Sequence, residues 1–444
     1  MSLSETIYAL SSGGPPSAIG VVRVTGKKAK KTLILMTQKI PEPRRMEHLK
    51  IRDAETKEVL DVGLVVYFSK SSSVTGEEMA EFHVHGSRAV IEGMFLSFSK
   101  IEGLRPAEPG EFTKRALLNG KIGITEVEAL ADLIDAETEA QRRQAIQQMQ
   151  GDLSKKYNFL RKKLISLRAE IEASLDFSDE VELSDVSYTG QKEKIFSLIR
   201  QINIEIKKGH QGKKLREGIK IALIGPPNVG KSSLINVLLK EKRAIVSSEA
   251  GTTRDVIEAR LNLKGIPVTI FDTAGIRLAR SNIEKEGIKR ARAIAKKADI
   301  IVFISDVLEN PPCFKEQGLL KNTKTINVIN KIDLIKNKRK LDGIAISCKT
   351  KKGISSFVKA LEFLATEITG VEEGLVGLNR MRHIVNLKET EKSLKTSLKE
   401  LNNNNIEISA EFLRAASTSL GRIVGTIGVE DVLDQLFKGF CIGK

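Results

Sequence analysis

Hydrophobic residues in the first part of the chain form the short, dense runs that are typical of β-strands. Runs rich in Val, Ile and Phe cover 18–26, 62–68 and 79–86, and Gly, Ser or Lys bounds them. Residues 87–101, SRAVIEGMFLSFSKI, instead follow a helical pattern. We therefore expect residues 1–118 to form a small α/β domain.

From about Thr125 the apolar spacing changes to that of long helices. Apolar residues recur every three or four positions up to Phe177 without a proline, which predicts one very long helix or two nearly collinear ones. Another helix is expected over 190–209, and the polar stretch 207–218 separates it from the next region of the chain. Further helical patterns cover 378–401, 409–420 and 429–437, with a break at NNNN (402–405).

Between these helical segments the pattern alternates strands and helices up to about residue 368, as in a doubly wound α/β domain. Helical segments flank this region on both sides. The simplest architecture inserts the α/β domain into one helical domain, because the ends of such domains often lie close together.

The strongest chemical signal is IKIALIGPPNVGKSSLINVLL (219–239). A buried strand precedes Gly225-x-x-x-x-Gly230-Lys231-Ser232, and an apolar helix follows, which is the context of a phosphate-binding P-loop. The glycines let backbone N–H groups surround the phosphates, and the helix N-terminus adds a favourable dipole. We expect Lys231 at the β- and γ-phosphates and Ser232 at Mg²⁺.

Motifs further along the chain indicate GTP rather than ATP. Asn330-Lys331-x-Asp333 follows an apolar strand, and a carboxylate there can accept from N1–H and the 2-amino group of guanine, a donor pair that adenine lacks. ISCKT (346–350) would contact the base oxygen through its backbone. Asp272 and Thr253 are expected near Mg²⁺, and Gly275 near the γ-phosphate. The predicted GTP-binding residues are Asn228, Val229, Gly230, Lys231, Ser232, Ser233, Ser247, Ser248, Glu249, Ala250, Gly251, Thr252, Thr253, Asp272, Thr273, Ala274, Gly275, Asn330, Lys331, Asp333, Ser347, Cys348 and Lys349.

The predicted fold class is therefore multidomain α/β plus all-α, and the predicted activity is GTP hydrolysis. We expect an N-terminal α/β domain at 1–118, a long-helix bundle domain at 119–212 and 371–444, and a Ras-like P-loop GTPase domain at 213–370. Signalling GTPases have a glutamine after DTAG that orients the attacking water. Ile276 stands there in this chain, so hydrolysis must recruit another group.

Composition narrows the class of protein only a little. Lys and Arg outnumber Asp and Glu by 72 to 56, for a net charge of +16, which fits a nucleic-acid partner or, equally, a Lys-rich solvated surface. Cys313, Cys348 and Cys441 are too few and too scattered for a disulfide framework or a zinc site. No stretch approaches the ~20 apolar residues of a membrane span, and no signal peptide is recognisable, so we expect a cytoplasmic protein.

The order of these elements, the GTTRD switch (251–255) and the terminal FCIGK (440–444) resemble the tRNA-modification GTPase family MnmE, also called TrmE. TGEEMAEFHVHG (75–86), RPAEPGEFTKRALLNGKI (105–122) and EALADLIDA (128–136) are similar to other signature stretches of that family. The resemblance thus extends over nearly the whole chain. HVHGS departs from the Gly-His-Gly-rich sequence that the family shows there.

The resemblance implies a homodimer whose GTPase domains face each other across the nucleotides, with K⁺ in the place of an arginine finger. A monovalent cation near the β- and γ-phosphates stabilises developing charge as an arginine would. Glu284 would orient the attacking water, and Glu286 is its rival for that role. The implied K⁺ ligands are Asn228, Ser247, Glu249 and Thr252.

The resemblance also implies a site for 5-formyltetrahydrofolate or a related reduced folate at the N-terminal dimer interface. Glu81 suits the donor edge of a pterin ring, and basic residues suit the carboxylates of its glutamate tail. His83 and His85 alternate on one strand face, but no third ligand lies nearby in the sequence for a metal site. The implied folate ligands are Arg23, Glu81, Lys121 and Lys444.

The implied reaction adds a carboxymethylaminomethyl or aminomethyl group to C5 of the wobble uridine (U34) of certain tRNAs. The flavin-dependent MnmG would share the work in a heterotetramer. The alternative is a ribosome-assembly GTPase that binds RNA, although such a protein has no use for the first 120 residues or the last five. The sequence leaves open which tRNAs are used, whether glycine or ammonium is the nitrogen donor, and how GTP turnover couples to the chemistry.

Cys441 lies four positions from the end of the chain, in CIGK. Prenylation fits badly, because Gly443 replaces an aliphatic residue and Lys444 replaces the usual last residue. We expect the preceding helix and Phe440 to hold this tail. Cys441 is therefore a candidate catalytic thiol or a residue that only lines the folate site.

Overall fold

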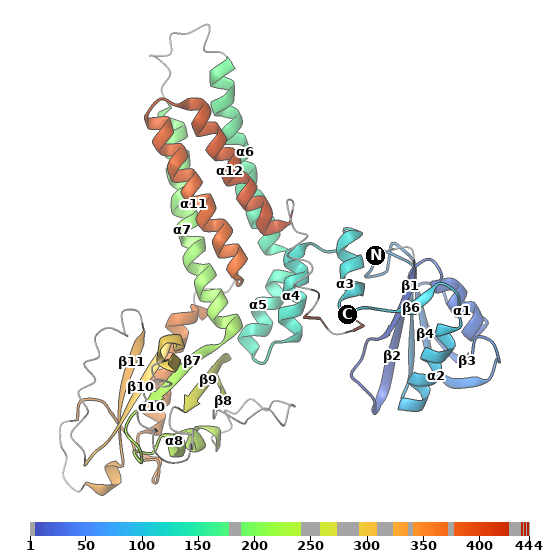
Figure 1. The fold of residues 1–444 in the computed structure, drawn as a ribbon, viewed down its shortest axis with the longest axis horizontal. Coiled ribbons are helices and arrows are strands. Elements are labelled where there is room, and N and C mark those ends of the chain that lie inside the picture. Colours follow the sequence, from blue (N-terminus) through green and yellow to red (C-terminus); the bar gives the residue numbers. More distant parts are fainter. Residues whose placement is uncertain are drawn as a thin grey trace. The chain divides into compact units, whose positions relative to one another are not determined.

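The structure of the chain is a computed structural model that describes residues 5–176, 188–240, 258–272, 293–308, 323–335, 341–371, 377–425, 437, 439–440 and 442–443. The chain divides into two compact units. One comprises residues 1–131 with 421–444, and the other comprises residues 132–420. Figure 1 colours them along the sequence.

The first unit contains a mixed β-sheet with the strand order β3-β4-β5-β2-β1-β6. Neighbouring strands are antiparallel except for β1 and β6, which are parallel. The predicted runs at 18–26, 62–68 and 79–86 correspond to three of these strands. The strands are β1 (Thr6–Leu10), β2 (Ser17–Thr25), β3 (Met46–Arg52), β4 (Val59–Phe68), β5 (Met79–Gly86) and β6 (Leu104–Pro106).

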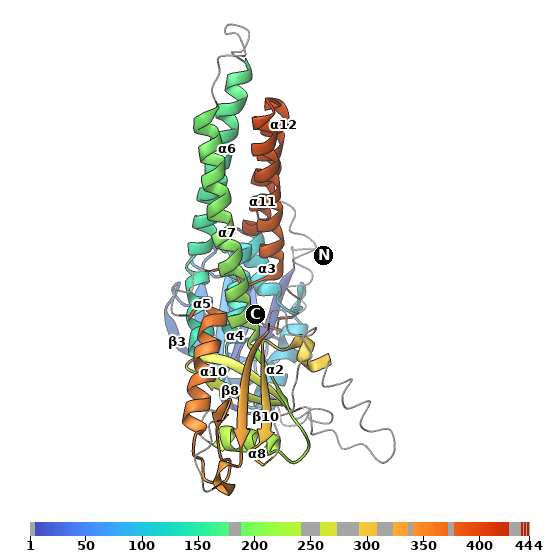
Figure 2. The ribbon, with the colours of Figure 1, turned by 90° about the vertical axis from the view of Figure 1, so that its left-hand side faces the viewer.

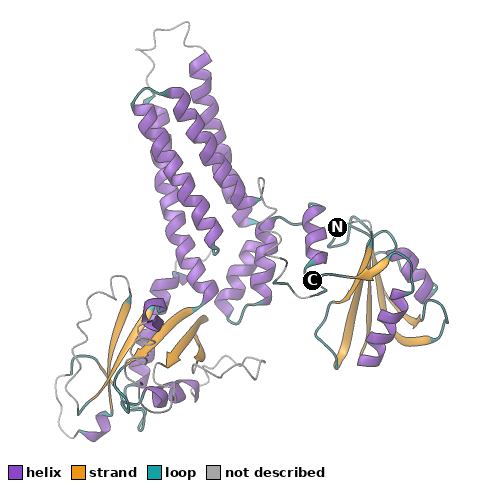
Figure 3. Ribbon diagram, in the orientation of Figure 1, coloured by secondary structure: helices purple, strands orange, loops and turns teal. Residues whose placement is uncertain are grey.

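Two helices, α1 (Ala29–Thr37) and α2 (Arg88–Ser99), pack on one face of this sheet. The helix predicted at 87–101 is confirmed as α2, and the Ser87 hydroxyl caps it by accepting from Val90 N. Side chains alternate along β5, so Phe82 is buried in the core with these helices while its neighbours Glu81 and His83 point to the other face. Figure 3 shows the helices and strands of this unit.

The unit also contains α3 (Glu111–Leu118) and most of α4 (Ile124–Ile134). Val127 of α4 packs against Phe437 and Phe440 from the end of the chain. Residues 109 and 442 form a β-bridge, and the Ser11 hydroxyl donates to the Gly443 carbonyl at 2.8 Å. The described tail residues are therefore held against this unit.

The second unit contains an elongated helical part in which α6, α7, α11 and α12 lie side by side (Figures 1 and 2). The helices are α5 (Glu139–Met149), α6 (Asp152–Asp176), α7 (Thr189–Glu217), α11 (Met381–Asn402) and α12 (Ile406–Val424), and the last turn of α12 extends into the other unit. The helix predicted at 429–437 lies mostly outside the described residues.

The prediction of one or two helices between Thr125 and Phe177 is wrong. The structure has three helices there, α4, α5 and α6. Thr138 and Gln141 form a capping box that begins α5, and Gly151 with φ of 77° separates α5 from α6. Each of the three helices buries one face, so apolar residues recur at helical spacing along the whole stretch. The hydrophobic pattern therefore does not reveal the two breaks.

The polar stretch 207–218 is also not a separator. It forms the last turns of α7, which continues to Glu217. Gly209 and Gly212 lie so close to Ile384 and Leu378 that an added Cβ would meet atoms 3.2 and 2.6 Å away. The glycines thus permit close packing of α7 against the returning chain.

The α/β part of the second unit is a sheet with the order β12-β11-β10-β7-β9-β8. Its strands are parallel except for the β8–β9 hairpin. Helices α8 (Lys231–Leu238) and α10 (Ile354–Thr369) pack on one face. The strands are β7 (Ile219–Ile224), β8 (Glu258–Leu263), β9 (Ile266–Asp272), β10 (Ile300–Asp306), β11 (Lys324–Asn330) and β12 (Ile344–Ala345).

Asp132 ties together the two points where the chain enters and leaves the α/β part. Its nearly buried carboxylate accepts from Arg216 Nε at 2.8 Å and Arg380 Nη2 at 2.6 Å, and also from Asn379 Nδ2 at 2.7 Å. Arg216 is at the end of α7, just before β7, and Arg380 directly precedes α11. Fixing both ends in this way is consistent with an α/β domain inserted into a helical one.

Candidate nucleotide-binding site

The loop between β7 and α8 has the backbone geometry of an anion cradle. Asn228 and Gly230 have positive φ, 62° and 97°, so the chain turns tightly before the first residue of α8, Lys231. An αL turn that leads into a helix N-terminus directs backbone N–H groups toward one point. A Cβ at Gly230 would lie 2.3 Å from Asn330 Nδ2, so a glycine is required there for packing as well as for conformation.

Lys231 lies over this loop. Its ammonium donates to the carbonyls of Gly225 at 2.7 Å and Pro226 at 2.6 Å. Burial lowers the pKa of Lys231, while the nearby carboxylate of Asp272 opposes that shift. A buried ammonium held by two carbonyls can exchange one of these bonds for a phosphate oxygen, a stronger acceptor.

Ser232 and Asp272 lie together at the end of the P-loop. The Ser232 hydroxyl donates to Asp272 Oδ2 at 2.6 Å, and Asp272 is fully buried at the end of β9. A hydroxyl beside a carboxylate is the kind of oxygen pair that Mg²⁺ binds. The sequence predicted both residues for this role. The fold brings them into contact because α8, which carries Ser232, follows β7, and β7 pairs with β9, which ends at Asp272.

Asn330 joins the P-loop to the loop after β12. Its buried amide donates from Nδ2 to the Val229 carbonyl at 2.7 Å, and its Oδ1 accepts from Cys348 N at 3.2 Å. The side chain therefore orders both loops and does not itself extend into solvent. Burial also raises the pKa of the Cys348 thiol.

Asp333 follows in a short 3₁₀ turn, η2 (Ile332–Leu334), and is exposed. The Ser347 hydroxyl donates to Asp333 Oδ1 at 2.6 Å and thereby lowers the pKa of Asp333. Ser347 in turn accepts from Thr350 N at 3.1 Å. The carboxylate is thus ionised and oriented at neutral pH, as an acceptor for two guanine donors requires.

One residue of the site was missed from the sequence. Asp306 ends β10 and accepts from Lys331 Nζ at 2.6 Å. Lys331 has φ of 63°, which is unusual for a residue other than glycine. No local pattern in the sequence marks this pair, because Asp306 and Asn330 become partners only through the register of the parallel strands β10 and β11.

Several predicted residues of the nucleotide site lie outside the described residues. They are Ser247, Ser248, Glu249, Ala250, Gly251, Thr252, Thr253, Thr273, Ala274, Gly275 and Glu284. Asn228, Ser233 and Lys349 lie in the described part, on the P-loop, on α8 and after β12.

A second group of predicted residues lies on the face of the N-terminal sheet opposite α1 and α2, where Phe112 of α3 also packs. Arg23 and Glu81 are direct partners across β2 and β5, with Arg23 Nε 2.8 Å and Nη2 2.7 Å from Glu81 Oε1. The Arg23 guanidinium lies 5.7 Å from the centre of the Phe112 ring. His83 Nε2 is buried 3.5 Å from Glu81 Oε2 and has no hydrogen-bond partner among the described residues.

Lys121 lies in the same unit, where its ammonium donates to the Ser71 carbonyl at 2.8 Å. No contact joins it to Arg23 or Glu81 within the described residues. Cys441 and Lys444 lie outside the described residues. Their neighbours Ile442 and Gly443 pack beside Pro109 and Ser11.

The described residues contain neither a cluster of metal-ligating side chains nor a membrane-spanning helix. No group of three or more His, Cys, Asp or Glu side chains there could hold a metal ion. His85 bonds instead to Asp61, with Nδ1 2.9 Å from Oδ1. No helix among those residues is long and apolar enough to cross a bilayer.

Comparisons with known proteins agree with this arrangement. The family model described as "MnmE helical domain" matches residues 124–441, and the one described as "GTP-binding protein TrmE N-terminus" matches residues 6–121. Among solved structures, the G domain of the T. maritima FeoB iron transporter is 27% identical and covers 34% of this chain and 98% of that chain. Its TM-score of 0.25 is too low to support an argument about fold.

Curated relatives match over the full length. A tRNA modification GTPase MnmE of Rhodopseudomonas palustris (strain CGA009) is 42% identical, with 99% of each chain covered. That of Parvibaculum lavamentivorans is 43% identical over 99% of this chain and 100% of the relative. The chain belongs to the MnmE family of tRNA modification GTPases and is a GTP hydrolase.

Proposed function

We propose that this enzyme is a K⁺-activated GTPase that adds a carboxymethylaminomethyl or aminomethyl group to C5 of U34 in certain tRNAs. In this proposal it works with the flavin-dependent MnmG and uses a reduced folate as one-carbon donor. The observation that carries the proposal is the 42% identity to the Rhodopseudomonas palustris relative over 99% of each chain. This match includes both the nucleotide site and the N-terminal unit.

GTP would bind with its phosphates in the P-loop and its base between Asp333 and the backbone at 347–349. The donors and acceptors fit: Lys231 is held over the loop, and Asp333 is oriented by Ser347. Mg²⁺ would be held by Ser232 and Thr253, with Asp272 in its outer shell. When bound, the metal neutralises charge on the phosphate oxygens.

Activation by K⁺ is proposed to depend on Asn228, Ser247, Glu249 and Thr252. Asn228 is exposed on the P-loop and has a positive φ. Glu284 would orient the attacking water, since Ile276 has no group to do so.

Glu284→Ala tests this assignment against its rival. We expect the variant to lose most GTP hydrolysis in K⁺ buffer while its affinity for GDP is kept, because the side chain acts on water and not on the nucleotide. Glu286→Ala serves as the matched control and should hydrolyse normally. Equal rates of GTP hydrolysis by wild type and Glu284→Ala in K⁺ buffer would rule out this role for Glu284.

The folate is proposed to bind at the face of the N-terminal sheet opposite α1 and α2, beside Phe112 of α3. Arg23, Glu81, Lys121 and Lys444 would be its ligands. The buried, unpartnered Nε2 of His83 beside Glu81 supports a polar ligand at this place, since buried polar atoms are normally hydrogen-bonded. Cys441 would either act chemically or only line this site.

Measuring the affinity for folate tests this site directly. Glu81→Gln should weaken binding of 5-formyltetrahydrofolate, followed by its ultraviolet absorbance after equilibrium dialysis. Glu47→Gln changes a residue of β3 and removes its ion pair with Lys39, and it should leave folate binding unchanged. If Cys441→Ser retains both folate binding and tRNA modification, Cys441 has no chemical role.

The domain assignment follows from the same proposal. Residues 1–118 would form the homodimer and bind folate together with Lys121 and Lys444 from the helical domain. Residues 119–212 and 371–444 would form that helical domain, and 213–370 would hydrolyse GTP. The GTPase domains would meet across the nucleotides during turnover, and MnmG would complete a heterotetramer.

Nucleoside analysis of tRNA from cells that lack this protein tests the function as a whole. Unmodified U34 that is restored by the wild-type gene is the expected result. Normal U34 together with accumulated ribosome precursors would instead identify a ribosome-assembly GTPase.

A further inference from the structure

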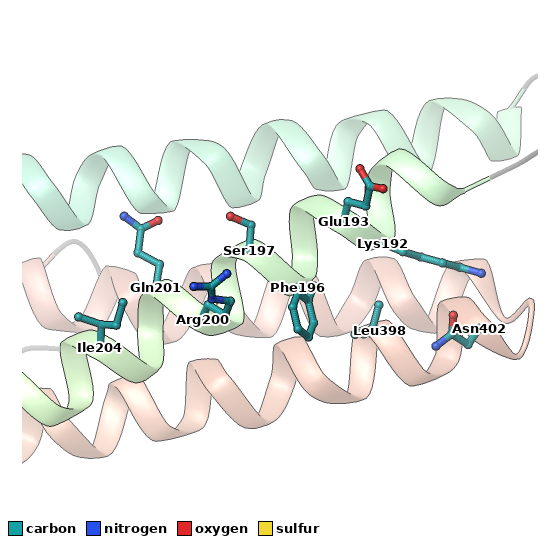
Figure 4. A pocket seen from close by; sticks show the side chains of 9 residues that line it. All are labelled: Lys192, Glu193, Phe196, Ser197, Arg200, Gln201, Ile204, Leu398 and Asn402. Carbon is teal, nitrogen blue, oxygen red and sulfur yellow. The ribbon is translucent and has the colours of Figure 1, made fainter.

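A groove of about 610 Å³ lies along α7 and α11 in the second unit (Figure 4). The two helices pack against each other and run in opposite directions (Figure 1). It does not overlap the nucleotide site or the N-terminal sheet. Its lining residues are Lys192, Glu193, Phe196, Ser197, Arg200, Gln201, Ile204, Leu398 and Asn402.

An exposed aromatic ring lies between two cations in this groove. Lys192, Phe196 and Arg200 are four residues apart on α7 and therefore share one face. Phe196 is 58% exposed, although it is a large apolar side chain. Figure 4 shows its ring between α7 and α11 near Leu398, with Lys192 and Arg200 on either side.

The positive charge at the ring is not cancelled by the described residues nearby. Neither Lys192 nor Arg200 forms an ion pair within the described part of the chain, whereas Lys194 on the same helix pairs with Glu170. Glu193, the acidic residue of the lining, points away from Phe196 in Figure 4.

Farther along α7, toward the α/β part, the cations are paired, because Lys213 lies 3.6 Å from Glu217 and Lys214 lies 2.5 Å from Asp299. Burial and then the positive charges of Lys388, Lys213 and Lys214 lower the pKa of His210 on α7. Lys388 belongs to α11, so it adds a cation near His210 from the second helix. The charge available to a polyanion in the groove itself is that of Lys192 and Arg200.

We propose that this groove binds an unpaired segment of tRNA, with one base stacked on Phe196 and the flanking phosphates at Lys192 and Arg200. An aromatic ring within a cationic groove is the usual platform for unpaired nucleotides. Sequence-tolerant stacking would hold the tRNA on the helical part while the wobble base is modified elsewhere. The inference rests on the proposed function only in naming tRNA as the RNA.

The groove suits RNA better than a helix of a protein partner. A docked amphipathic helix requires a continuous apolar stripe in its groove. Here the apolar residues Phe196, Ile204 and Leu398 are separated by charged and amide side chains. The Phe196 ring between two cations instead matches a base between two phosphates of a single strand.

Phe196→Ala in the full-length protein tests the stacking. We expect about 5- to 150-fold weaker binding of an unmodified tRNA transcript, from the value of stacking one base. Phe363→Ala removes a 70% exposed ring from α10 in the same unit and should not change the Kd. GTP hydrolysis and circular dichroism of both variants should equal those of wild type.

The double variant Lys192→Gln/Arg200→Gln tests the phosphate contacts. The slope of log K against log salt for tRNA should fall by about 1.4, because each single-strand phosphate contact contributes about 0.7. Lys359→Gln, on α10, should leave the slope unchanged.

Three results would overturn the proposal. One is equal tRNA affinity for Phe196→Ala and Phe363→Ala. Another is an equal loss by Phe196→Ala for tRNA and for a fully paired RNA stem, since no base is then stacked. The third is weaker binding of MnmG with unchanged tRNA binding, which would assign the groove to protein docking. None of these changes the prediction that cells without the protein lack U34 modification.

Discussion

Asn330 connects the phosphate side and the base side of the nucleotide site, and its replacement by alanine isolates that connection. The side chain is 2% exposed and makes two hydrogen bonds, 2.7 Å to the Val229 carbonyl and 3.2 Å from Cys348 N. Asn330→Ala removes both. Val229 belongs to the P-loop, and Cys348 belongs to the loop at the base.

The expected loss follows from these two bonds. A hydrogen bond contributes about 0.5–1.5 kcal/mol net, and a buried group left without a partner costs about 1–3 kcal/mol. Val229 is 1% exposed and Cys348 is half-buried, so loss of the side chain leaves their polar groups without this partner and the two loops of the site unconnected. We therefore expect about 2–4 kcal/mol, or about 30- to 900-fold weaker GDP binding.

Titration with a fluorescent GDP analogue measures this loss. Asn327→Ala is the matched control, because Asn327 is exposed on the same strand, β11. Asn330→Asp keeps an acceptor for Cys348 N but sets an oxygen against the Val229 carbonyl, so it should not rescue binding. If Asn330→Ala binds GDP within threefold of the Asn327→Ala control, the two bonds do not hold the loops in place.

Two further predictions concern other charged groups. Asp333→Asn should weaken GDP binding about 10- to 100-fold, because the charged hydrogen bonds to guanine are lost. Xanthosine diphosphate should then compete better than GDP, because the new amide can donate to its 2-oxo group. An unchanged preference for GDP would refute the base contact. Burial alone would raise the pKa of Glu111, but hydrogen bonds from Arg105, the Glu108 N–H and Arg115 lower it from 4.5 to about 2. A depressed pKa stabilises the folded state above pH 4.5, and this contribution is lost as pH falls toward 2. Glu111→Gln should therefore cost about 3 kcal/mol at neutral pH, with a deficit that shrinks on acidification in thermal melts; a deficit that is constant with pH would contradict the ion pairs.

Local signals in the sequence were sufficient for the nucleotide site. The P-loop spacing, Asn330-Lys331-x-Asp333 and Asp272 at a strand end each depend on backbone geometry within a few residues, and the topology of a parallel sheet gathers strand ends at one edge. These patterns place Ser232 and Asp272 in one site, in agreement with their 2.6 Å contact in the fold. The strands at 18–26, 62–68 and 79–86 were predictable for the same reason, since period-two burial is a local pattern.

Contacts between distant segments required the tertiary structure. The breaks that make α4, α5 and α6 separate helices were hidden, because apolar periodicity continues through them and only Thr138 and Gly151 mark the ends. The pairing of Asp306 with Lys331 depends on sheet register.

The joint at Asp132 unites residues 84 and 248 positions away along the chain. The groove at Phe196 likewise needs α11, about 200 residues later, to form its second wall. The sequence alone determined which chemistry the strand ends carry, because that depends on neighbours along the chain. Only the fold decided which distant side chains form ion pairs or line one surface, because burial and pairing depend on neighbours in space.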